Sequence, residues 1–226
     1  MPLVTRVAAA FANAGFWAVA LVSLPAVPSA RRELRVLRDR RVLLTNALVQ
    51  GATFCTFTCL ALPATRVTGL DEAWVPGVPA LFGVGSLAGV TLGGRIADAH
   101  PTVLTFAGTG SLAAGWTALA LAAGNPAVAG ALVFVQGMLA FGTGPALIVR
   151  VLRAAAEAPT PAGGFATAAF NVGAVAGPWL GGVAIGAGLG FRSPVWVSVL
   201  LMCLAAGVLA AQVRTLRAVD PVNAGR

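Results

Sequence analysis

Side chains able to perform acid–base, nucleophilic or metal chemistry are few in this sequence and stand far apart. Its 226 residues include fifteen arginines, seven acidic residues, one histidine, three cysteines and no lysine. Cys55 and Cys59 are four residues apart and share one face of a helix, but the one histidine, His100, is not near them. An enzyme or metal site needs a nucleophile with its base, or several ligands together. We therefore predict no enzymatic activity, no metal and no cofactor, and expect the cysteines to be small packing residues.

Uncharged polar side chains offer a different chemistry, which is hydrogen bonding in an apolar environment. Asn46, Gln50 and Thr53 are spaced by four and three residues, which places them on one face of a helix. Gln136 and Asn171 are two further candidates in apolar stretches. These five residues could line a substrate cavity. The alternative is that they bond between helices, where each such bond contributes about 0.6 kcal/mol on average.

Glycines at four-residue spacing mark two related segments. Residues 82–94 read F-G-V-G-S-L-A-G-V-T-L-G-G, and 88 residues later 170–182 read F-N-V-G-A-V-A-G-P-W-L-G-G, with eight of thirteen positions identical. Small residues at this spacing let helix backbones approach closely in lipid. We predict a mechanical role in helix packing for Gly85, Gly89, Gly93, Gly173, Gly177, Pro178, Gly181 and Gly182.

The elements that must position these residues are helices long enough to cross a membrane. Hydrophobic residues make up 58% of the chain and charged residues 10%, whereas a soluble domain carries about a quarter charged residues. A membrane helix needs about 20 apolar residues, and the sequence contains several uncharged runs of at least that length. The predicted fold class is an all-α polytopic membrane protein, with helices at about 42–64, 77–97, 102–123, 127–149, 165–189 and 194–213.

Arginine placement predicts how these helices are oriented. When the connecting segments are assigned alternately to two sides, twelve arginines fall on one side, and Arg6, Arg66 and Arg192 fall on the other. Positive charge is enriched in cytoplasmic loops, so the C-terminus and the tail 218–226 are predicted to be cytoplasmic in a multi-pass protein of the cell membrane. The net charge of +8 is therefore attributed to topology. The expected partner is the lipid bilayer and not nucleic acid.

The first 41 residues are assigned separately from the six helices. Residues 3–27 are predicted to be a short or partial membrane span, with a secretory signal peptide as the alternative. Residues 28–41 contain six arginines and are predicted to be a basic cytoplasmic loop between bundles, or an amphipathic helix in the headgroup region. The six-helix bundle is assigned to residues 42–217.

Several motifs resemble those of a known family. G-G-R-I-A-D (93–98) resembles the loop signature of the major facilitator superfamily, and G-x-x-x-G-P-x-x-G-G (173–182) resembles the antiporter motif of drug–proton exchangers. The chain as a whole is similar to the C-terminal half of chloramphenicol-resistance and arabinose-efflux-like permeases. Three stretches carry this similarity: R-R-E-L-R-V-L-R-D-R-R-V-L-L, G-A-T-F-C-T-F-T and W-V-P-G-V-P-A-L-F-G-V-G-S-L-A-G-V-T.

The resemblance implies a fold and a function. An offset of 88 residues equals three helices, so the six-helix bundle is expected to consist of two inverted three-helix repeats, as in each half of such a transporter. The expected function is efflux of a small hydrophobic drug of the chloramphenicol type by proton antiport when the transporter is complete. Gly94, Arg95 and Asp98 would form a gating loop, although Arg95 and Asp98 could simply pair on the helix surface. Ala99-His100-Pro101 stand where the motif continues with basic residues.

Proton exchange requires a carboxylate or a histidine that titrates in reach of the cavity, and the predicted spans contain neither. We expect that group to come from a missing N-terminal bundle or from a partner chain. Three alternatives remain: a truncated remnant that does not transport, a half-transporter that works only by association, and a sugar exporter.

Overall fold

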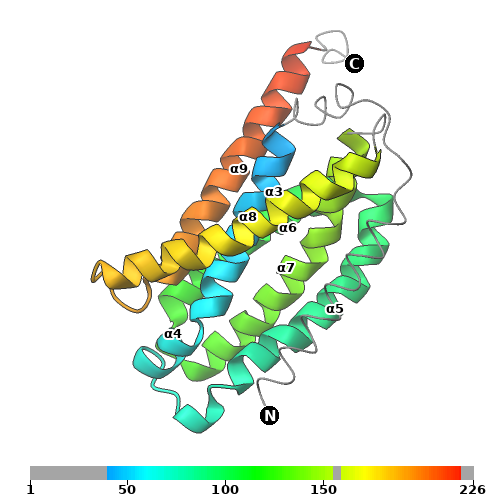
Figure 1. The fold of residues 1–226 in the computed structure, drawn as a ribbon. Helices are drawn as coiled ribbons and strands as arrows, with labels where there is room; N and C mark the ends of the chain where they lie inside the picture. The colour runs from blue at the N-terminus through cyan, green and yellow to red at the C-terminus, as the bar shows by residue number, and fades with distance from the viewer. Residues whose placement is uncertain (1–39, 155–158, 220–226) are drawn as a thin grey trace.

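The computed structural model describes residues 40–154 and 159–219, and every regular element in these ranges is a helix (Figure 1). Six of these helices are long and apolar enough to cross a membrane, which confirms the predicted all-α polytopic fold. Two shorter helices lie between the first and second of them. In chain order the elements are α3 (Arg40–Cys59), α4 (Ala61–Arg66), the 3₁₀ helix η2 (Glu72–Trp74), α5 (Gly77–Ala99), α6 (Pro101–Ala122), α7 (Pro126–Ala154), α8 (Pro159–Gly186) and α9 (Ser193–Val219).

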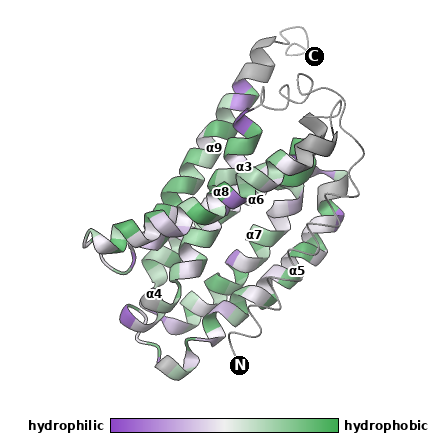
Figure 2. Ribbon diagram, viewed as in Figure 1, coloured by the Kyte–Doolittle hydropathy of each residue, from purple (hydrophilic) through white to green (hydrophobic). Residues whose placement is uncertain are grey.

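Local sequence explains where the long helices begin and turn. Pro101 occupies the first turn of α6, where its missing N–H group costs nothing. The side chain of Asn125 caps α7, because its Oδ1 accepts hydrogen bonds from the N–H groups of Ala127 and Val128 at 3.1 and 3.2 Å. The turn between α8 and α9 requires Gly188 and Gly190, which have φ angles of +78° and +84°. Hydrophobic residues dominate the middle of the helices, and many hydrophilic residues lie toward their ends (Figure 2).

Several predicted boundaries were wrong. The helix predicted at 42–64 is two helices, because Pro63 has no N–H group to donate to the carbonyl of Cys59, where α3 ends. Conversely, α8 begins at Pro159 and not at 165, since prolines are tolerated in a first helical turn. At the two ends, α3 starts at Arg40 within the predicted loop 28–41, and α9 continues to Val219 beyond residue 217. The predicted span 3–27, residues 28–39 and residues 220–226 lie outside the described residues.

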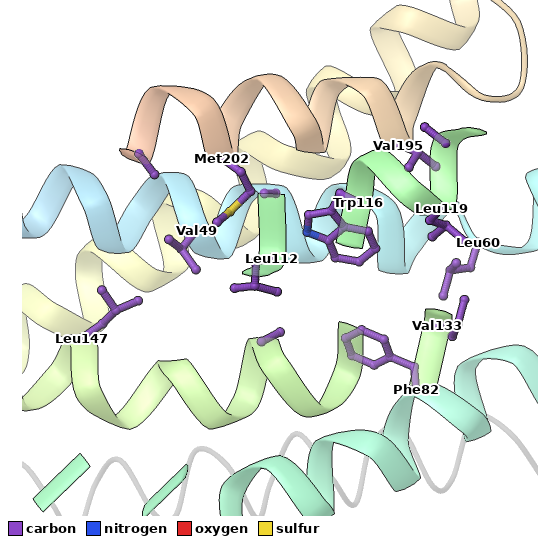
Figure 3. Close-up of a cluster of buried hydrophobic side chains, with 14 residues drawn as sticks. Val49, Leu60, Phe82, Leu112, Trp116, Leu119, Val133, Leu147, Val195 and Met202 are labelled. Atoms are coloured by element: carbon purple, nitrogen blue, oxygen red, sulfur yellow. The ribbon is translucent and has the colours of Figure 1, made fainter. Parts of the chain in front are cut away.

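The two three-helix repeats, α3–α5–α6 and α7–α8–α9, pack against each other through helices of the opposite repeat. The middle helix of each repeat packs along the first helix of the other, so that α5 lies against α7 and α8 lies against α3. The third helices, α6 and α9, contact each other as well as α7 and α3. Between these helices lies a core that includes Val49, Leu112, Trp116, Leu147 and Met202 (Figure 3).

The middle helices, α5 and α8, keep one apolar face exposed. Only 22% of the apolar window of each is buried in the bundle, against 56% for α3. On α5 the exposed side chains include Leu87, at 71% exposure, and on α8 they include Val175 and Trp179, at 72% and 66%. These faces are apolar enough to lie against lipid or against another membrane protein.

Candidate functional site

The glycines of the first segment lie in direct backbone contact with α7. A methyl group placed on Gly89 would lie 2.8 Å from the carbonyl carbon of Met138 and closer still to its oxygen. The same substitution at Gly85 would meet the backbone of Phe134, and at Gly93 the backbone of Gly142. Real Cβ atoms essentially never come within 3.0 Å of such atoms, so only glycine allows this approach.

The second glycine segment forms the equivalent contact between α8 and α3. A methyl group on Gly177 would lie 2.8 Å from the carbonyl carbon of Gly51, and one on Gly173 would lie 2.9 Å from its nitrogen. At Gly181 the obstacle is the Sγ atom of Cys55, at 2.9 Å. The two interfaces therefore use the same three positions of the repeated segment.

The partner residues repeat as well. Phe134 and Ala47, the backbone neighbours of Gly85 and Gly173, are 87 residues apart, and the glycines themselves are 88 apart. Met138 and Gly51, the neighbours of Gly89 and Gly177, are likewise 87 residues apart. The close approach is therefore a property of the inverted repeat and not of one helix pair.

Gly182 differs from the glycines with which it was grouped. It is exposed, and a methyl group there would meet no atom within 4 Å. It follows Gly181 directly in the helix and so points about 100° away from the contact face. Gly182 is therefore not a packing position in the described bundle, whereas Pro178, inside α8, is partly buried.

The three polar residues of α3 face the interior of the bundle. Asn46 is 1% exposed, and its Nδ2 donates a hydrogen bond of 3.0 Å to the carbonyl oxygen of Ala166 on α8. Thr53 donates to the carbonyl oxygen of Val49 within its own helix, at 2.9 Å. Gln50 is 7% exposed and has no hydrogen-bond partner in the part of the chain that the structure describes. Of these three, Asn46 makes the interhelical bond that the packing interpretation expects.

Gln136 fits into a notch that the sequence did not suggest. It is fully buried on α7, and its Nε2 donates to the carbonyl oxygen of Leu112 on α6 at 3.2 Å. A methyl group on Gly115 of α6 would lie 2.8 Å from the Cδ atom of Gln136, and one on Gly108 would lie 2.9 Å from the Cγ2 atom of Thr143. Gly108 and Gly115 are seven residues apart, as are Gln136 and Thr143. This matched seven-residue spacing is the sequence feature from which the contact between α6 and α7 could have been predicted.

A second pair of polar side chains joins α3 to α9. The hydroxyl oxygens of Thr56 and Ser198 are 2.7 Å apart, and the Ser198 hydroxyl lies 2.6 Å from the carbonyl oxygen of Ala52. The thiol of Cys55 donates to the carbonyl oxygen of Pro194 at 3.3 Å. These buried groups are satisfied between helices, which is the cheaper arrangement in an apolar surrounding.

The remaining predicted residues are not brought to this interior. Asn171 is exposed on α8, beside Val172 and on the open side of that helix. A methyl group added to Gly94 would have no atom within 4 Å, and Arg95 is exposed near the end of α5. The side chain of Asp98 lies outside the described residues, so its predicted pairing or gating role stays a prediction. The five polar candidates therefore do not line one common surface.

An apolar cavity of about 350 Å³ lies where α4, η2 and the adjacent ends of the long helices meet. The hydroxyl of Thr68, one of its few polar groups, already lies within hydrogen-bonding distance of the carbonyl oxygens of Ala123 and Pro63, at 2.8 and 3.2 Å. A volume of this size holds a small molecule. Its lining, which includes Leu60, Val78, Leu81 and Val133, suits an apolar one.

At the end of the bundle opposite this cavity, arginine side chains form contacts between the helices. The guanidinium of Arg150 on α7 donates to Oε1 of Gln212 on α9 at 2.9 Å and lies 5.5 Å from the ring centre of Phe106 on α6. Arg41 of α3 reaches the carbonyl oxygen of Ala211 on α9 at 3.5 Å. These contacts link α7 to α6 and α9, and α3 to α9, on the side that is rich in arginine.

Comparison with known proteins gives a consistent group of relatives. The chain is 44% identical over 216 residues to a chloramphenicol resistance protein of Streptomyces lividans, an alignment that covers 85% of this chain and 55% of that protein. It is 32% identical over 192 residues to the inner membrane transport protein YdhP of Escherichia coli, covering 80% of this chain and 49% of the relative. It is 29% identical over 179 residues to YtbD of Bacillus subtilis, an uncharacterized MFS-type transporter, covering 76% and 45%.

These relatives confirm the family resemblance drawn from the motifs. The chain spans about half the length of the relatives that it matches. No protein-family model matches it.

Proposed function

We propose that this homologue of major facilitator transporters is one six-helix bundle of an exporter of small, uncharged, hydrophobic molecules. The observation that carries the proposal is the pair of glycine interfaces, α5 with α7 and α3 with α8, which the inverted repeat relates. Transporters of this class are built from inverted repeats and change access by rocking one bundle against another around a site near the membrane midplane. Glycine contacts without interlocking side chains suit helices that must tilt while remaining packed.

The second bundle is proposed to cover the open faces of α5 and α8. Those faces carry exposed apolar side chains such as Leu87 and Val175, and the matched relatives are about twice as long as the aligned region. An N-terminal bundle or a partner chain would fill this position. Its burial of the two faces would complete a cavity between the bundles.

The substrate is proposed to resemble the drug in the name of the Streptomyces lividans relative. The membrane spans of this chain carry no charged side chain at their middle, which suits an uncharged molecule. Proton antiport requires a titratable group in reach of the cavity, and in this proposal the second bundle provides it. The cytoplasmic C-terminus follows from the positive-inside distribution of arginine.

A domain replacement tests the proposal. The segment of the chloramphenicol resistance protein that matches this chain is replaced by the corresponding residues of this chain. Growth on chloramphenicol and accumulation of labelled drug are then measured in a susceptible host. We expect the hybrid to lower accumulation relative to the empty vector, and the effect to disappear when a protonophore collapses the proton gradient.

Three control measurements separate the alternatives. Residues 1–226 expressed alone should not lower drug accumulation, whereas export by this chain alone would favour a half-transporter that functions by association. A hybrid that is folded and membrane-inserted but does not export would favour the remnant that does not transport. Efflux of labelled arabinose in place of chloramphenicol would identify a sugar exporter.

A further inference from the structure

Five phenylalanine rings form a continuous row across four helices, which we call the phenylalanine row. The ring of Phe54 on α3 lies edge-on to Phe170 on α8, with ring centres 5.6 Å apart, and 6.3 Å from Phe57 on its own helix. Phe57 approaches Phe82 on α5 at 4.9 Å, and Phe82 lies edge-on to Phe141 on α7 at 6.2 Å. All four distances lie in the range of interacting aromatic rings. Three pairs have the preferred edge-to-face geometry, and Phe57 and Phe82 are tilted at 44°.

The row follows the symmetry of the bundle. Phe82 and Phe170 are 88 residues apart, and Phe54 and Phe141 are 87 apart, the same offsets that relate the glycine interfaces. The α3–α8 ring pair is therefore the repeat equivalent of the α7–α5 pair, and Phe57 joins the two. Because the repeats are inverted, the row crosses the junction between them, where transporters of this architecture hold their substrate.

Four of the five rings in the row keep part of their surface exposed. Phe141 is 36% exposed, and Phe54, Phe57 and Phe170 are partly exposed, while Phe82 is buried and points into the core (Figure 3). Rings that served only to fill the core would be buried like Phe82. The partly exposed members leave ring surface available to a ligand.

A hydrogen-bonding group accompanies the rings. Gln50 precedes Phe54 by four residues and Phe57 by seven, so it shares their helix face. Its side chain is more than nine-tenths buried, and its amide has no partner among the described residues. One turn earlier, the Oδ1 atom of Asn46 is buried without a partner, whereas its Nδ2 is bonded to Ala166. The amide of Gln50 and the Oδ1 atom of Asn46 can therefore still bind a polar group that enters the row.

We propose that the phenylalanine row with Gln50 is the substrate-binding surface of this bundle, and that it takes an uncharged molecule with an aromatic ring and a hydrogen-bonding substituent. Stacking on the rings supplies affinity, and the Gln50 amide orients the substituent. A sugar is a poorer fit, because its many hydroxyl groups need more partners than this surface offers. The inference rests on the proposed transport function and assigns the substrate class of the same site.

Equilibrium binding to the full 226-residue chain in lipid nanodiscs tests the inference. The probes are labelled chloramphenicol, which is aromatic and uncharged, and labelled arabinose, which has no ring of this kind. Phe54→Leu and Phe141→Leu remove one ring from each repeat, Phe54→Trp keeps an aromatic ring, and Gln50→Leu removes the amide. Phe191→Leu is the matched control, since Phe191 is exposed between α8 and α9 and outside the row.

We expect chloramphenicol to bind saturably and arabinose not to bind. Each Leu variant in the row should weaken chloramphenicol binding by roughly 2- to 12-fold, the range that corresponds to one aromatic pair. Gln50→Leu should also weaken it, whereas Phe54→Trp and Phe191→Leu should bind like the wild type. Thermal unfolding of every variant shows whether a loss of binding is a loss of fold, and Phe141→Leu keeps the test falsifiable if Phe54→Leu does not fold.

The failures of the site and of transport are distinguishable. The site is overturned if the wild-type chain shows no saturable chloramphenicol binding, or if folded Phe54→Leu and Phe141→Leu chains bind as tightly as Phe191→Leu. Should the hybrid transporter export drug in that case, the proposed function stands without this site. Ring-dependent binding combined with a folded hybrid that does not export would support the site and remove the transport proposal.

Discussion

Replacement of Gly89 by alanine is the most direct test of the close contact between α5 and α7. The added methyl group would lie 2.8 Å from the carbonyl carbon of Met138 and 2.9 Å from its Cα atom, whereas ordinary contact begins at 3.4 Å. The obstacle is backbone, which cannot turn aside as a side chain can. The two helices would therefore have to move apart by more than half an ångström along this contact.

The size of the effect follows from two opposing contributions. Overpacking of a close contact typically costs about 1–3 kcal/mol. Alanine in place of glycine in a helix returns up to about 1 kcal/mol through helix propensity. Gly83→Ala, on the same helix, gains the helix propensity of alanine without the overpacking cost, because a methyl group there has no atom within 4 Å. We therefore expect Gly89→Ala to be less stable than Gly83→Ala by about 1–3 kcal/mol.

The free energy of unfolding of each variant can be measured by titration with a denaturing detergent, followed by circular dichroism. Gly177→Ala should behave like Gly89→Ala, because its methyl group would lie 2.8 Å from the carbonyl carbon of Gly51 in the equivalent interface. Equal stability of Gly89→Ala and Gly83→Ala would refute the close backbone contact. An effect at Gly89 without one at Gly177 would refute the equivalence of the two interfaces.

Three further predictions concern the other contacts and the topology. Gly115→Ala should destabilise the wild-type chain but have little effect in a Gln136→Ala background. In a double-mutant cycle measured by detergent unfolding, the coupling free energy should be about 0.5–3 kcal/mol. Additive effects would contradict the notch between α6 and α7. Ser198→Ala should cost about 0.6 kcal/mol and at most about 1.7 kcal/mol by the same measurement, whereas Thr58→Ala, at an exposed position of α3, should cost less. In intact cells an impermeant maleimide should label a cysteine introduced at Arg66 but not one at Arg214, and the reverse result would invert the proposed topology.

The helices and the glycine contacts were predictable because each depends on a local pattern. Long uncharged runs define membrane spans, and six such helices are present. The spacing of Gly85, Gly89 and Gly93 puts them on one face of α5 whatever that face contacts. Sequence alone could not identify the partner, because either repeat offers apolar helices with small residues. The exchange between repeats, α5 with α7 and α8 with α3, is visible only in the folded chain.

The polar candidates were harder to interpret, because a helix face does not reveal its neighbour. Asn46 and Gln136 were predicted from the same signal, yet they donate to different helices, α8 and α6. Asn171 carries the same kind of side chain but is exposed. The break after Cys59 could have been predicted from Pro63, since a proline there cannot continue the helix.

The contacts that hold the bundle together leave some buried polar atoms of the described helices without a partner. A membrane bundle gains little from burying apolar side chains, because lipid is equally apolar, so it must be held by close packing and by hydrogen bonds. Here the close packing lies at the two glycine interfaces, and interhelical hydrogen bonds are donated by Gln136 to α6 and by Ser198 to α3. Among the described residues, buried polar atoms without a partner occur on α6 (Thr109 Oγ1 and Trp116 Nε1), on α7 (Gln136 Oε1) and on α3 (Asn46 Oδ1). On α3 this atom and the Gln50 amide share a helix face with the partly exposed ring of Phe54. Unmet hydrogen-bonding capacity beside exposed aromatic surface contributes least to the stability of an isolated bundle and most to the binding of a ligand, so this is the part of the chain where function is expected.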